Sequence, residues 1–218
     1  MDQSAQEMQA YYSSRAAYYD AVYLKPERQQ DIAFLRDYLP AQLAGRKVLE
    51  IACGTGYWTQ YIAPVTRAML ATDGNPDPLA FARMRPGTEH IQFQVADAFR
   101  LGAELGQFDA AFAGLWFSHI LKQDQQNFLN GLHTRLQPGA RVILIDNNAA
   151  QLRDFPITET DADGNTFQHR ELRDGSVHRI LKNFPTEAEL SALVTGCAAN
   201  VHYRELENFW LFSYTLAL

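Results

Sequence analysis

Short apolar runs alternate with helix-like segments through most of the chain. The apolar runs occupy residues 47–52, 68–72, 91–95, 108–115 and 141–146. Each run has the length of a buried strand. Apolar side chains recur at helical spacing in segments between them, at 58–62, 77–84 and 128–136. Because strands that alternate with helices build successive βαβ units, the pattern predicts an α/β fold around a mostly parallel sheet.

The alternation breaks at residues 147–184. Asp163-Gly164 and Asp174-Gly175 are turn dipeptides between extended segments in this range. Such turns are typical of hairpins, so we expect an antiparallel excursion from the main sheet.

The last part of the chain predicts one helix and two strands. Thr186 and Glu189 have the spacing of a capping box, which marks the start of a helix. Residues 201–206 and 210–217 are then predicted to form the final two strands. They bring the expected number of strands in the main sheet to seven.

The composition favours one globular domain with a small partner. The chain has 218 residues, of which 47% are hydrophobic, and this suits one sizeable core. The formal net charge is -6, so we expect no surface for nucleic acid or anionic lipid. The apolar runs are much shorter than the roughly 18–20 residues that span a bilayer, and residues 1–20 lack a signal-peptide pattern. These features predict a cytoplasmic protein that contacts no membrane.

The two cysteines indicate no covalent or metal framework. Cys53 and Cys197 are far apart in the sequence and lack a CxxC or His-rich neighbourhood. We therefore expect neither a disulfide nor a metal site. The sequence leaves the oligomeric state open.

A glycine-rich turn follows the first predicted strand, in the sequence VLEIACGTG at 48–56. Glycines allow a ligand to approach the backbone closely, the turn's amides offer donors, and the carboxylate of Glu50 favours a cation. A dinucleotide-binding turn is the alternative. It is disfavoured because Thr59 occupies the position of the third glycine and an acid lies just upstream, where a pyrophosphate would be repelled.

This segment resembles motif I of the class I S-adenosylmethionine-dependent methyltransferases, with Ala52 where that family usually has glycine. Asp73, after the second strand, matches the acid that binds the ribose hydroxyls in this family. Asp97 matches the acid that meets the adenine amino group. Residues 108–119 resemble motif IV, where the fourth strand opens onto the reactive methyl group. The resemblance covers about residues 11–150 in order.

The resemblance implies a single Rossmann-like domain, 1–218, with a mostly parallel seven-stranded sheet, helices on both faces, an N-terminal helical lid and an antiparallel insertion over the pocket. It divides the chain into a lid (1–42), a cofactor-binding core (43–150), a substrate-cover insertion (151–184) and a C-terminal helix with strands (185–218). S-adenosylmethionine is then the cofactor and S-adenosylhomocysteine its product. The cofactor contacts that it implies are Tyr19, Glu50, Ala52, Gly54, Gly56, Tyr57, Trp58, Asp73, Gly74, Asp97, Ala98, Phe99 and Gly114.

A narrower resemblance concerns the acceptor. Residues 54–59 (GTGYWT), residues 170–175, Lys182 and Phe184 are similar to a bacterial subgroup that includes the phosphonate O-methyltransferase of dehydrophos biosynthesis. This implies methyl transfer to an oxygen of a small acid or hydroxyl. N- or S-methylation of a small metabolite, a non-catalytic cofactor-binding protein and a nicotinamide-dependent reductase remain alternatives.

Several side chains are candidates for chemistry at the acceptor. His119 lies in the motif IV segment, where a neutral imidazole suits a general base, although packing or capping would explain it equally. Arg170, Arg179 and Lys182 lie in the predicted insertion and form a possible cationic clamp for an acid, unless they are solvated surface cations. Tyr11 and Trp116 are candidates for an aromatic wall around the acceptor, with core packing as the alternative.

Overall fold

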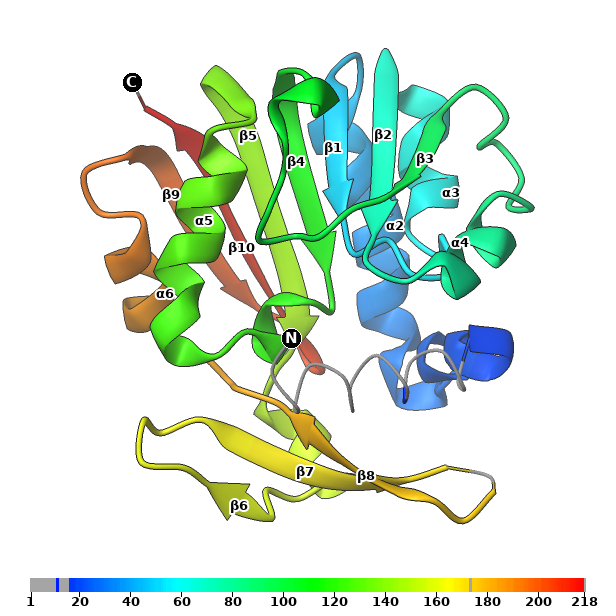
Figure 1. Ribbon diagram of the computed structural model, residues 1–218, viewed down its shortest axis with the longest axis vertical. Coiled ribbons are helices and arrows are strands. Elements are labelled where there is room, and N and C mark those ends of the chain that lie inside the picture. Colours follow the sequence, from blue (N-terminus) through cyan, green and yellow to red (C-terminus); the bar gives the residue numbers. More distant parts are fainter. Residues whose placement is uncertain (1–10, 12–15, 173, 218) are drawn as a thin grey trace.

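The computed structural model describes Tyr11, residues 16–172 and residues 174–217, with the backbone alone for residues 16–19. Within these residues, a seven-stranded sheet has the order β3-β2-β1-β4-β5-β10-β9 (Figure 1). β1 to β5 pair in parallel, and β10 is antiparallel to both β5 and β9. The mostly parallel seven-stranded sheet is therefore confirmed. Its strands are β1 (Lys47–Ile51), β2 (Ala68–Asp73), β3 (Gln92–Val95), β4 (Phe108–Gly114), β5 (Leu136–Asn147), β9 (Ala198–Glu205) and β10 (Phe209–Leu216).

Helices cover both faces of the sheet, as expected. α2 and α3 lie on one face, whereas α5 and α6 lie on the other (Figure 1). The α-helices are α2 (Gln29–Leu43), α3 (Thr59–Ile62), α4 (Pro76–Ala82), α5 (Gln125–His133) and α6 (Glu187–Leu193). The 3-10 helices are η1 (Ala16–Tyr23), η2 (Pro26–Arg28), η3 (Ala63–Val65), η4 (Ala103–Leu105), η5 (Phe117–His119), η6 (Lys122–Asp124) and η7 (Ala149–Arg153).

The central strands are apolar on both faces, and this produces two cores. Val48 and Ile143 pack with α2 and α3, whereas their neighbours Leu49 and Leu144 pack with α5 and α6. Successive side chains of a strand point to opposite faces, so a continuous apolar run fits a strand that is covered on both sides. The runs seen in the sequence have this physical origin.

Two helices differ from the sequence expectation. Ile32, Leu35 and Leu39 of α2 are fully buried against the sheet, so residues 29–42 of the expected lid belong to the core. α5 ends at His133, and Leu136 is the first residue of β5 rather than part of the helix. In α6, the capping box between Thr186 and Glu189 is present as expected.

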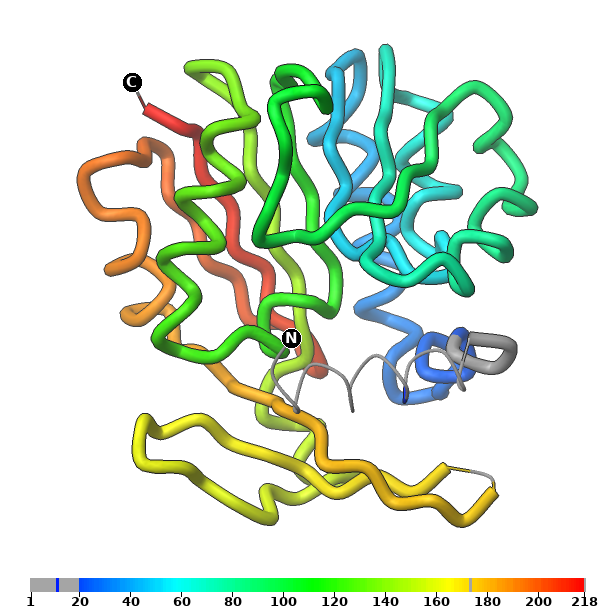
Figure 2. Tube along the Cα trace, viewed as in Figure 1, coloured from blue at the N-terminus to red at the C-terminus, as the bar shows by residue number. Residues whose placement is uncertain are grey.

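The expected antiparallel excursion forms a separate three-stranded sheet of β6 (Glu159–Thr160), β7 (Thr166–Glu171) and β8 (Val177–Leu181). Figures 1 and 2 show this sheet beyond the edge at which β4 and β5 end. Backbone and amide hydrogen bonds join the segment after β8 to η5 and the residue that follows it, beyond the end of β4. Asn183 donates from its backbone N to the Ser118 carbonyl at 2.8 Å and from Nδ2 to the Ile120 carbonyl at 3.0 Å.

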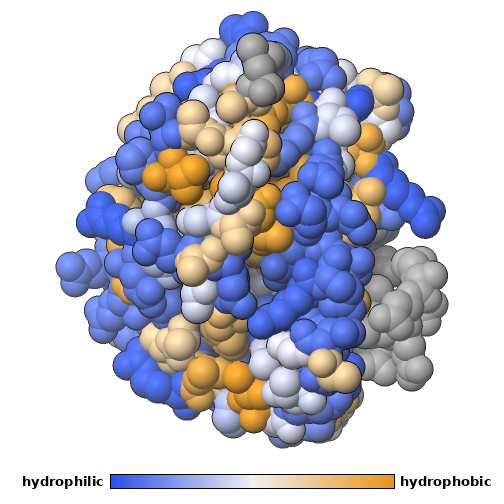
Figure 3. All heavy atoms as spheres, turned by 90° about the vertical axis from the view of Figure 1, so that its left-hand side faces the viewer, coloured by the Kyte–Doolittle hydropathy of each residue, from blue (hydrophilic) through white to orange (hydrophobic). Residues whose placement is uncertain are grey.

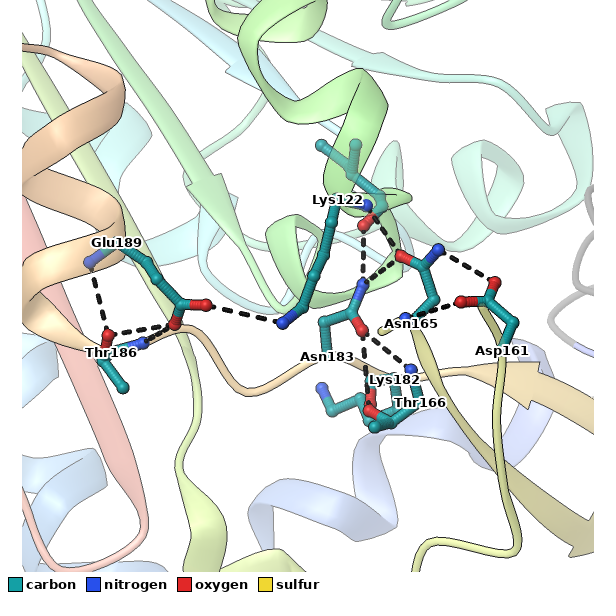
Figure 4. Close-up of polar contacts among 9 residues, drawn as sticks. Lys122, Asp161, Asn165, Thr166, Lys182, Asn183, Thr186 and Glu189 are labelled. Carbon is teal, nitrogen blue, oxygen red and sulfur yellow. Dashed lines mark hydrogen bonds and ion pairs between the residues drawn. The ribbon is translucent and has the colours of Figure 1, made fainter. Parts of the chain in front are cut away.

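The side-chain amides of Asn165 and Asn183 form further hydrogen bonds between the insertion and the segment after β4 (Figure 4). Asn165 Oδ1 accepts from the backbone N of Lys122 at 2.7 Å and from Asn183 Nδ2 at 3.2 Å. Asn183 Oδ1 accepts from the backbone N of Thr166 at 3.0 Å. The insertion is thus a fixed part of the molecule at this end, because buried polar groups are satisfied by one another.

The edge strand β9 is largely exposed to solvent. Residues 199–202 of β9 are exposed, and the face around them is mostly hydrophilic with small apolar patches (Figure 3). No helix within the described residues is both long and apolar enough to span a membrane.

Candidate active site

Polar residues gather where the parallel strands end. Asp97 follows β3, Asp73 ends β2, the glycine turn follows β1, Gly114 ends β4, and Asp146 is near the end of β5. The carboxyl ends of parallel strands lie at one edge of a sheet, which is the usual ligand-binding edge of an open α/β sheet. The structure therefore brings these positions into one row.

The glycine turn has a left-handed backbone at three positions. Ala52, Gly54 and Gly56 have φ angles of 53°, 56° and 75°. A Cβ at Gly56 would lie 2.9 Å from the Cα of Ala82 in α4, so this glycine is needed for close packing, whereas a Cβ at Gly54 would meet nothing within 4 Å. Ala52 holds a conformation that costs an L-residue about 1–2 kcal/mol. Backbone strain is therefore the consequence of alanine at this position.

Glu50 is buried directly below the turn. Its carboxyl accepts a hydrogen bond from Thr59 Oγ1 at 2.7 Å. Burial raises its pKa to about 8, the Thr59 bond acts against this shift, and the nearby Asp73 adds to it. Glu50 is therefore mostly protonated at neutral pH, and a cation placed beside it would favour its ionised form.

Asp73 ties the glycine turn to β2. Its Oδ2 accepts from the backbone N of Gly54 at 2.9 Å, and its Oδ1 accepts from the backbone N of Asn75 at 2.9 Å. Burial raises its pKa although both bonds favour the carboxylate. Asp73 thus orients the turn, and Gly74 beside it is exposed.

The loop after β3 is open to solvent. Asp97 Oδ1 accepts from the backbone N of Phe99 at 2.9 Å, which forms a tight turn. Ala98 is half-buried, and Phe99 is 42% exposed with its ring edge-on to Trp116 at 6.4 Å between centroids. An exposed aromatic ring beside a carboxylate suits a planar ligand.

Tyr57 and Trp58 are buried on the α2 side of the sheet. Tyr57 stacks on Tyr23 at 3.6 Å and accepts a hydrogen bond from Arg36 at 2.8 Å, so its side chain serves the packing of the N-terminal helices. Trp58 packs against Gly114, where a Cβ would lie 3.0 Å from its Cδ1. Its indole N–H is buried and has no hydrogen-bond partner among the described residues.

His119 is buried in η5, just beyond β4. Its Nδ1 donates to the Leu181 carbonyl at 2.6 Å, which fixes the neutral tautomer with its lone pair on Nε2. Burial and the charge of Lys182 lower its pKa to about 3, although Asp146 acts in the opposite direction. The imidazole is therefore neutral at physiological pH.

Lys182 forms a fully buried ion pair. Its Nζ lies 2.7 Å from Asp146 Oδ1 and donates to Ser118 Oγ at 2.6 Å. Asp146 Oδ2 also accepts from the backbone N of Ser118 at 3.0 Å. Burial lowers the pKa of Lys182 to about 8 although Asp146 favours the ammonium. Lys182 is thus a partnered interior cation, and the sequence analysis missed Asp146, whose position at the end of an apolar strand was the available signal.

Arg170 is a second buried cation. Its guanidinium donates to Gln168 Oε1 at 2.6 Å and to Gln151 Oε1 at 3.4 Å, and it lies over the Phe155 ring. Within the described residues, no carboxylate lies within ion-pair distance of it. It is 5% exposed, so the expectation of a solvated hairpin cation does not hold for it.

Arg179 does not lie with the buried cations Lys182 and Arg170. In the β7–β8 register it pairs with His169, whereas Arg170 pairs with His178, so the two arginines lie on opposite faces of the small sheet. Arg179 contacts Glu159 at 2.5 Å and stacks on Phe167. The structure separates it from the expected clamp.

The aromatic candidates have different environments. Tyr11 is buried with Leu172 and Ile180, next to the insertion, and Trp116 is half-buried. The side chain of Tyr19 lies outside the described residues. Cys53 and Cys197 are free thiols, and no set of three metal-binding side chains occurs in the part of the chain that the structure describes.

Comparisons with known proteins agree with this geometry. A family model described as a methyltransferase domain matches residues 48–139. The ubiquinone biosynthesis O-methyltransferase of Azotobacter vinelandii is 31% identical over 105 residues, 46% of this chain and 44% of the relative. The corresponding protein of Xanthomonas oryzae pv. oryzae is 27% identical over 161 residues, 72% of this chain and 64% of the relative. The match thus spans less than half of the first relative.

Solved structures match over nearly the whole chain. A DhpI–SAH complex gives a TM-score of 0.77 at 25% identity and covers 97% of this chain and 96% of its own. A DhpI–SAM–HEP complex gives 0.77 at 26% identity, with 98% and 99% covered. Magnesium protoporphyrin IX methyltransferase from Synechocystis PCC 6803, at 15% identity and a TM-score of 0.69, shares the fold. The strand order, the glycine turn after β1 and these matches show the fold of the class I S-adenosylmethionine-dependent methyltransferases, with a match to a methyltransferase domain over residues 48–139.

Proposed function

We propose that the protein transfers the methyl group of S-adenosylmethionine to an oxygen of a small acid. Support for the cofactor comes from the family and from the DhpI complexes, which contain SAM or SAH. Support for an oxygen acceptor comes from the O-methyltransferase relatives. Support for an acid comes from one observation on this chain, the buried Arg170 without a carboxylate partner among the described residues.

The residues at the strand edge fit this cofactor. The open backbone at Gly54 offers room for a ligand, and Glu50 suits its amino group. The buried indole N–H of Trp58, which has no partner among the described residues, is a hydrogen-bond donor suited to a polar ligand. When bound, the cofactor would supply an electrophilic methyl group on a sulfonium. The proposed contacts remain those derived from the sequence: Tyr19, Glu50, Ala52, Gly54, Gly56, Tyr57, Trp58, Asp73, Gly74, Asp97, Ala98, Phe99 and Gly114.

The acceptor class follows from the charge balance of the buried polar cluster. Arg170 and Lys182 carry two positive charges, and Asp146 is the carboxylate that pairs with Lys182. A buried charge is costly unless it is paired, so the cluster favours an additional anion. A guanidinium binds a carboxylate or phosphonate through two parallel hydrogen bonds. Such an acid is already ionised at neutral pH and needs no base to become nucleophilic.

His119 then acts by orientation rather than by strong basicity. With a pKa of about 3, its imidazole is a weak proton acceptor, whereas its bond to the Leu181 carbonyl holds η5 against β8, beside Lys182. Keeping the bound acid in line with the methyl group supplies a large part of the acceleration, so a displacement of η5 would slow turnover. We expect His119→Ala to keep its affinity for S-adenosylhomocysteine and to lose about tenfold or more in turnover; unchanged turnover would contradict this role.

Calorimetric titration with S-adenosylhomocysteine and, separately, with NADH tests the function. Micromolar binding of the former alone is expected, followed by turnover in a screen of small phosphonic and carboxylic acids. Binding of NADH alone would instead favour a reductase. Binding without turnover of any acid, alcohol, amine or thiol would favour a non-catalytic cofactor-binding protein.

The role of Arg170 is tested by Arg170→Met. We expect KM for the acid to rise tenfold or more, since a charge-assisted bidentate contact is lost. The melting temperature should change little, because loss of the hydrogen bonds to Gln168 and Gln151 is offset by removal of a buried charge that has no carboxylate partner among the described residues. Arg179→Met is the matched control, because it removes a guanidinium from the same hairpin on the opposite face. Equal KM values for both variants would refute an acid-binding role of Arg170.

A further inference from the structure

A carboxylate of the N-terminal segment is bonded into the glycine turn. Asp20, in η1, accepts a hydrogen bond from Thr55 Oγ1 at 2.7 Å and forms an ion pair with Arg85. Arg85 also donates from Nε to the Thr55 carbonyl at 2.9 Å. The three residues are separated by at least 30 positions in the chain, so they join three distant segments at one point.

Thr55 occupies the critical position of the turn. It lies between Gly54 and Gly56, which both have a left-handed backbone, and it is 4% exposed. Glycines restrict their own torsion angles very little, so the orientation of the amides in this turn depends on neighbouring contacts. The side chain and the carbonyl of Thr55 are the groups that Asp20 and Arg85 hold.

Arg85 is itself fixed against the turn. It follows α4 closely, and a Cβ at Gly56 would lie 3.2 Å from its Cγ. The side chains of Arg85 and Asp20 are 24% and 30% exposed, so water screens their ion pair only in part. The contacts of Asp20 therefore form a rigid link between η1 and the turn rather than a loose surface pair.

We propose that Asp20 is a positioning residue of the cofactor site, which acts through Thr55 to hold the amides of the Gly54–Gly56 turn. The inference rests on the proposed function, because it assigns these amides to cofactor binding. Asp20 needs no contact with the cofactor. Loss of the Asp20 carboxylate removes the contact between η1 and the glycine turn, so the turn becomes more mobile and the cofactor dissociates faster. The residues proposed to bind the methyl acceptor keep their geometry.

Asp20→Asn tests the proposal, with S-adenosylhomocysteine as the probe. The expected result is a loss of about tenfold in affinity, the scale of one charge-assisted hydrogen bond, expressed mainly as faster dissociation. KM for S-adenosylmethionine should rise in parallel while kcat changes little. Asp109→Asn is the matched control. Asp109 is also 30% exposed, pairs with Arg67 and accepts from the Lys47 amide at 2.6 Å, but it lies near the start of β4, at the other end of the strands from the glycine turn.

A double-mutant cycle separates this role from general electrostatic attraction. If Asp20 acts through Thr55, then Asp20→Asn has little further effect on affinity in the Thr55→Val background. If Asp20 only attracts a cationic ligand at a distance, its effect persists undiminished in that background, and the proposal is overturned. Unchanged affinity of Asp20→Asn overturns it too. Failure of the wild-type protein to bind the probe would instead overturn the proposed function, and this inference with it.

Discussion

Lys182→Met is expected to lower the free energy of unfolding by about 3–5 kcal/mol, because it leaves a buried carboxylate without its ammonium partner. Asp146 is fully buried and keeps only hydrogen-bond donors such as the backbone N of Ser118. Urea unfolding followed by circular dichroism measures the loss. The magnitude would be among the largest for any single substitution in this protein, since most cost about 0.5–3 kcal/mol.

An exposed ion pair provides the control for this prediction. Arg179 and Glu159 have side chains that are 31% and 45% exposed, so Arg179→Met should cost less than about 1 kcal/mol. Equal losses for the two variants would mean that the Lys182–Asp146 pair contributes no more than a surface contact.

The buried lysine itself can respond to pH when its carboxylate partner is removed. Burial already lowers the pKa of Lys182 to about 8, and removal of Asp146 would lower it further. The amine of Asp146→Asn can therefore lose its proton, so the deficit of this variant against the wild type should shrink as pH rises from 6 to 9. The deficit of Lys182→Met should not shrink in this way, because the Asp146 carboxylate remains buried without its ammonium partner from pH 6 to 9.

The sequence predicted those features that depend on local pattern. Strands with a continuous apolar run, such as 142–145, are recognisable because both of their faces are covered. The capping box at Thr186 defines a helix start on its own. The row of acids at the strand edge was also predictable, because parallel strands bring their carboxyl ends together. α2 was assigned to the lid although Ile32, Leu35 and Leu39 form a helical stripe that a closer analysis of periodicity detects.

Features that depend on register or on distant pairing were not predictable. The faces of Arg170 and Arg179 follow from the exact pairing of β7 with β8, and the turn dipeptide alone does not define how many residues the turn contains. Lys182 and Asp146 are separated by 36 positions, and each resembles an ordinary polar residue at the end of a strand. Their contact is created by the position of the insertion against β5.

Glu50→Gln is expected to abolish a pH dependence of stability in the ligand-free protein. The pKa of Glu50 is about 8 when folded, against an ordinary value of 4.5. Between pH 4.5 and 8 the folded state holds a proton that the unfolded state has released. The contribution of this proton to the free energy of unfolding is therefore fully present below pH 4.5 and is lost as pH rises through 8. The wild type should lose up to about 5 kcal/mol from this group between pH 4.5 and 9, on a scale of about 1.4 kcal/mol per unit.

The same carboxyl connects stability to cofactor binding. If the cofactor's amino group pairs with Glu50, binding lowers the pKa of this carboxyl and releases its proton at pH 7. Calorimetry with S-adenosylhomocysteine in phosphate and in Tris should then give enthalpies that differ by nearly the full difference in buffer ionisation enthalpy, and affinity should rise with pH up to about 8. Glu50→Gln should remove the buffer dependence. Identical wild-type enthalpies in both buffers would mean that Glu50 stays protonated under the bound cofactor, and that its function is to support the turn through Thr59 rather than to hold a cation.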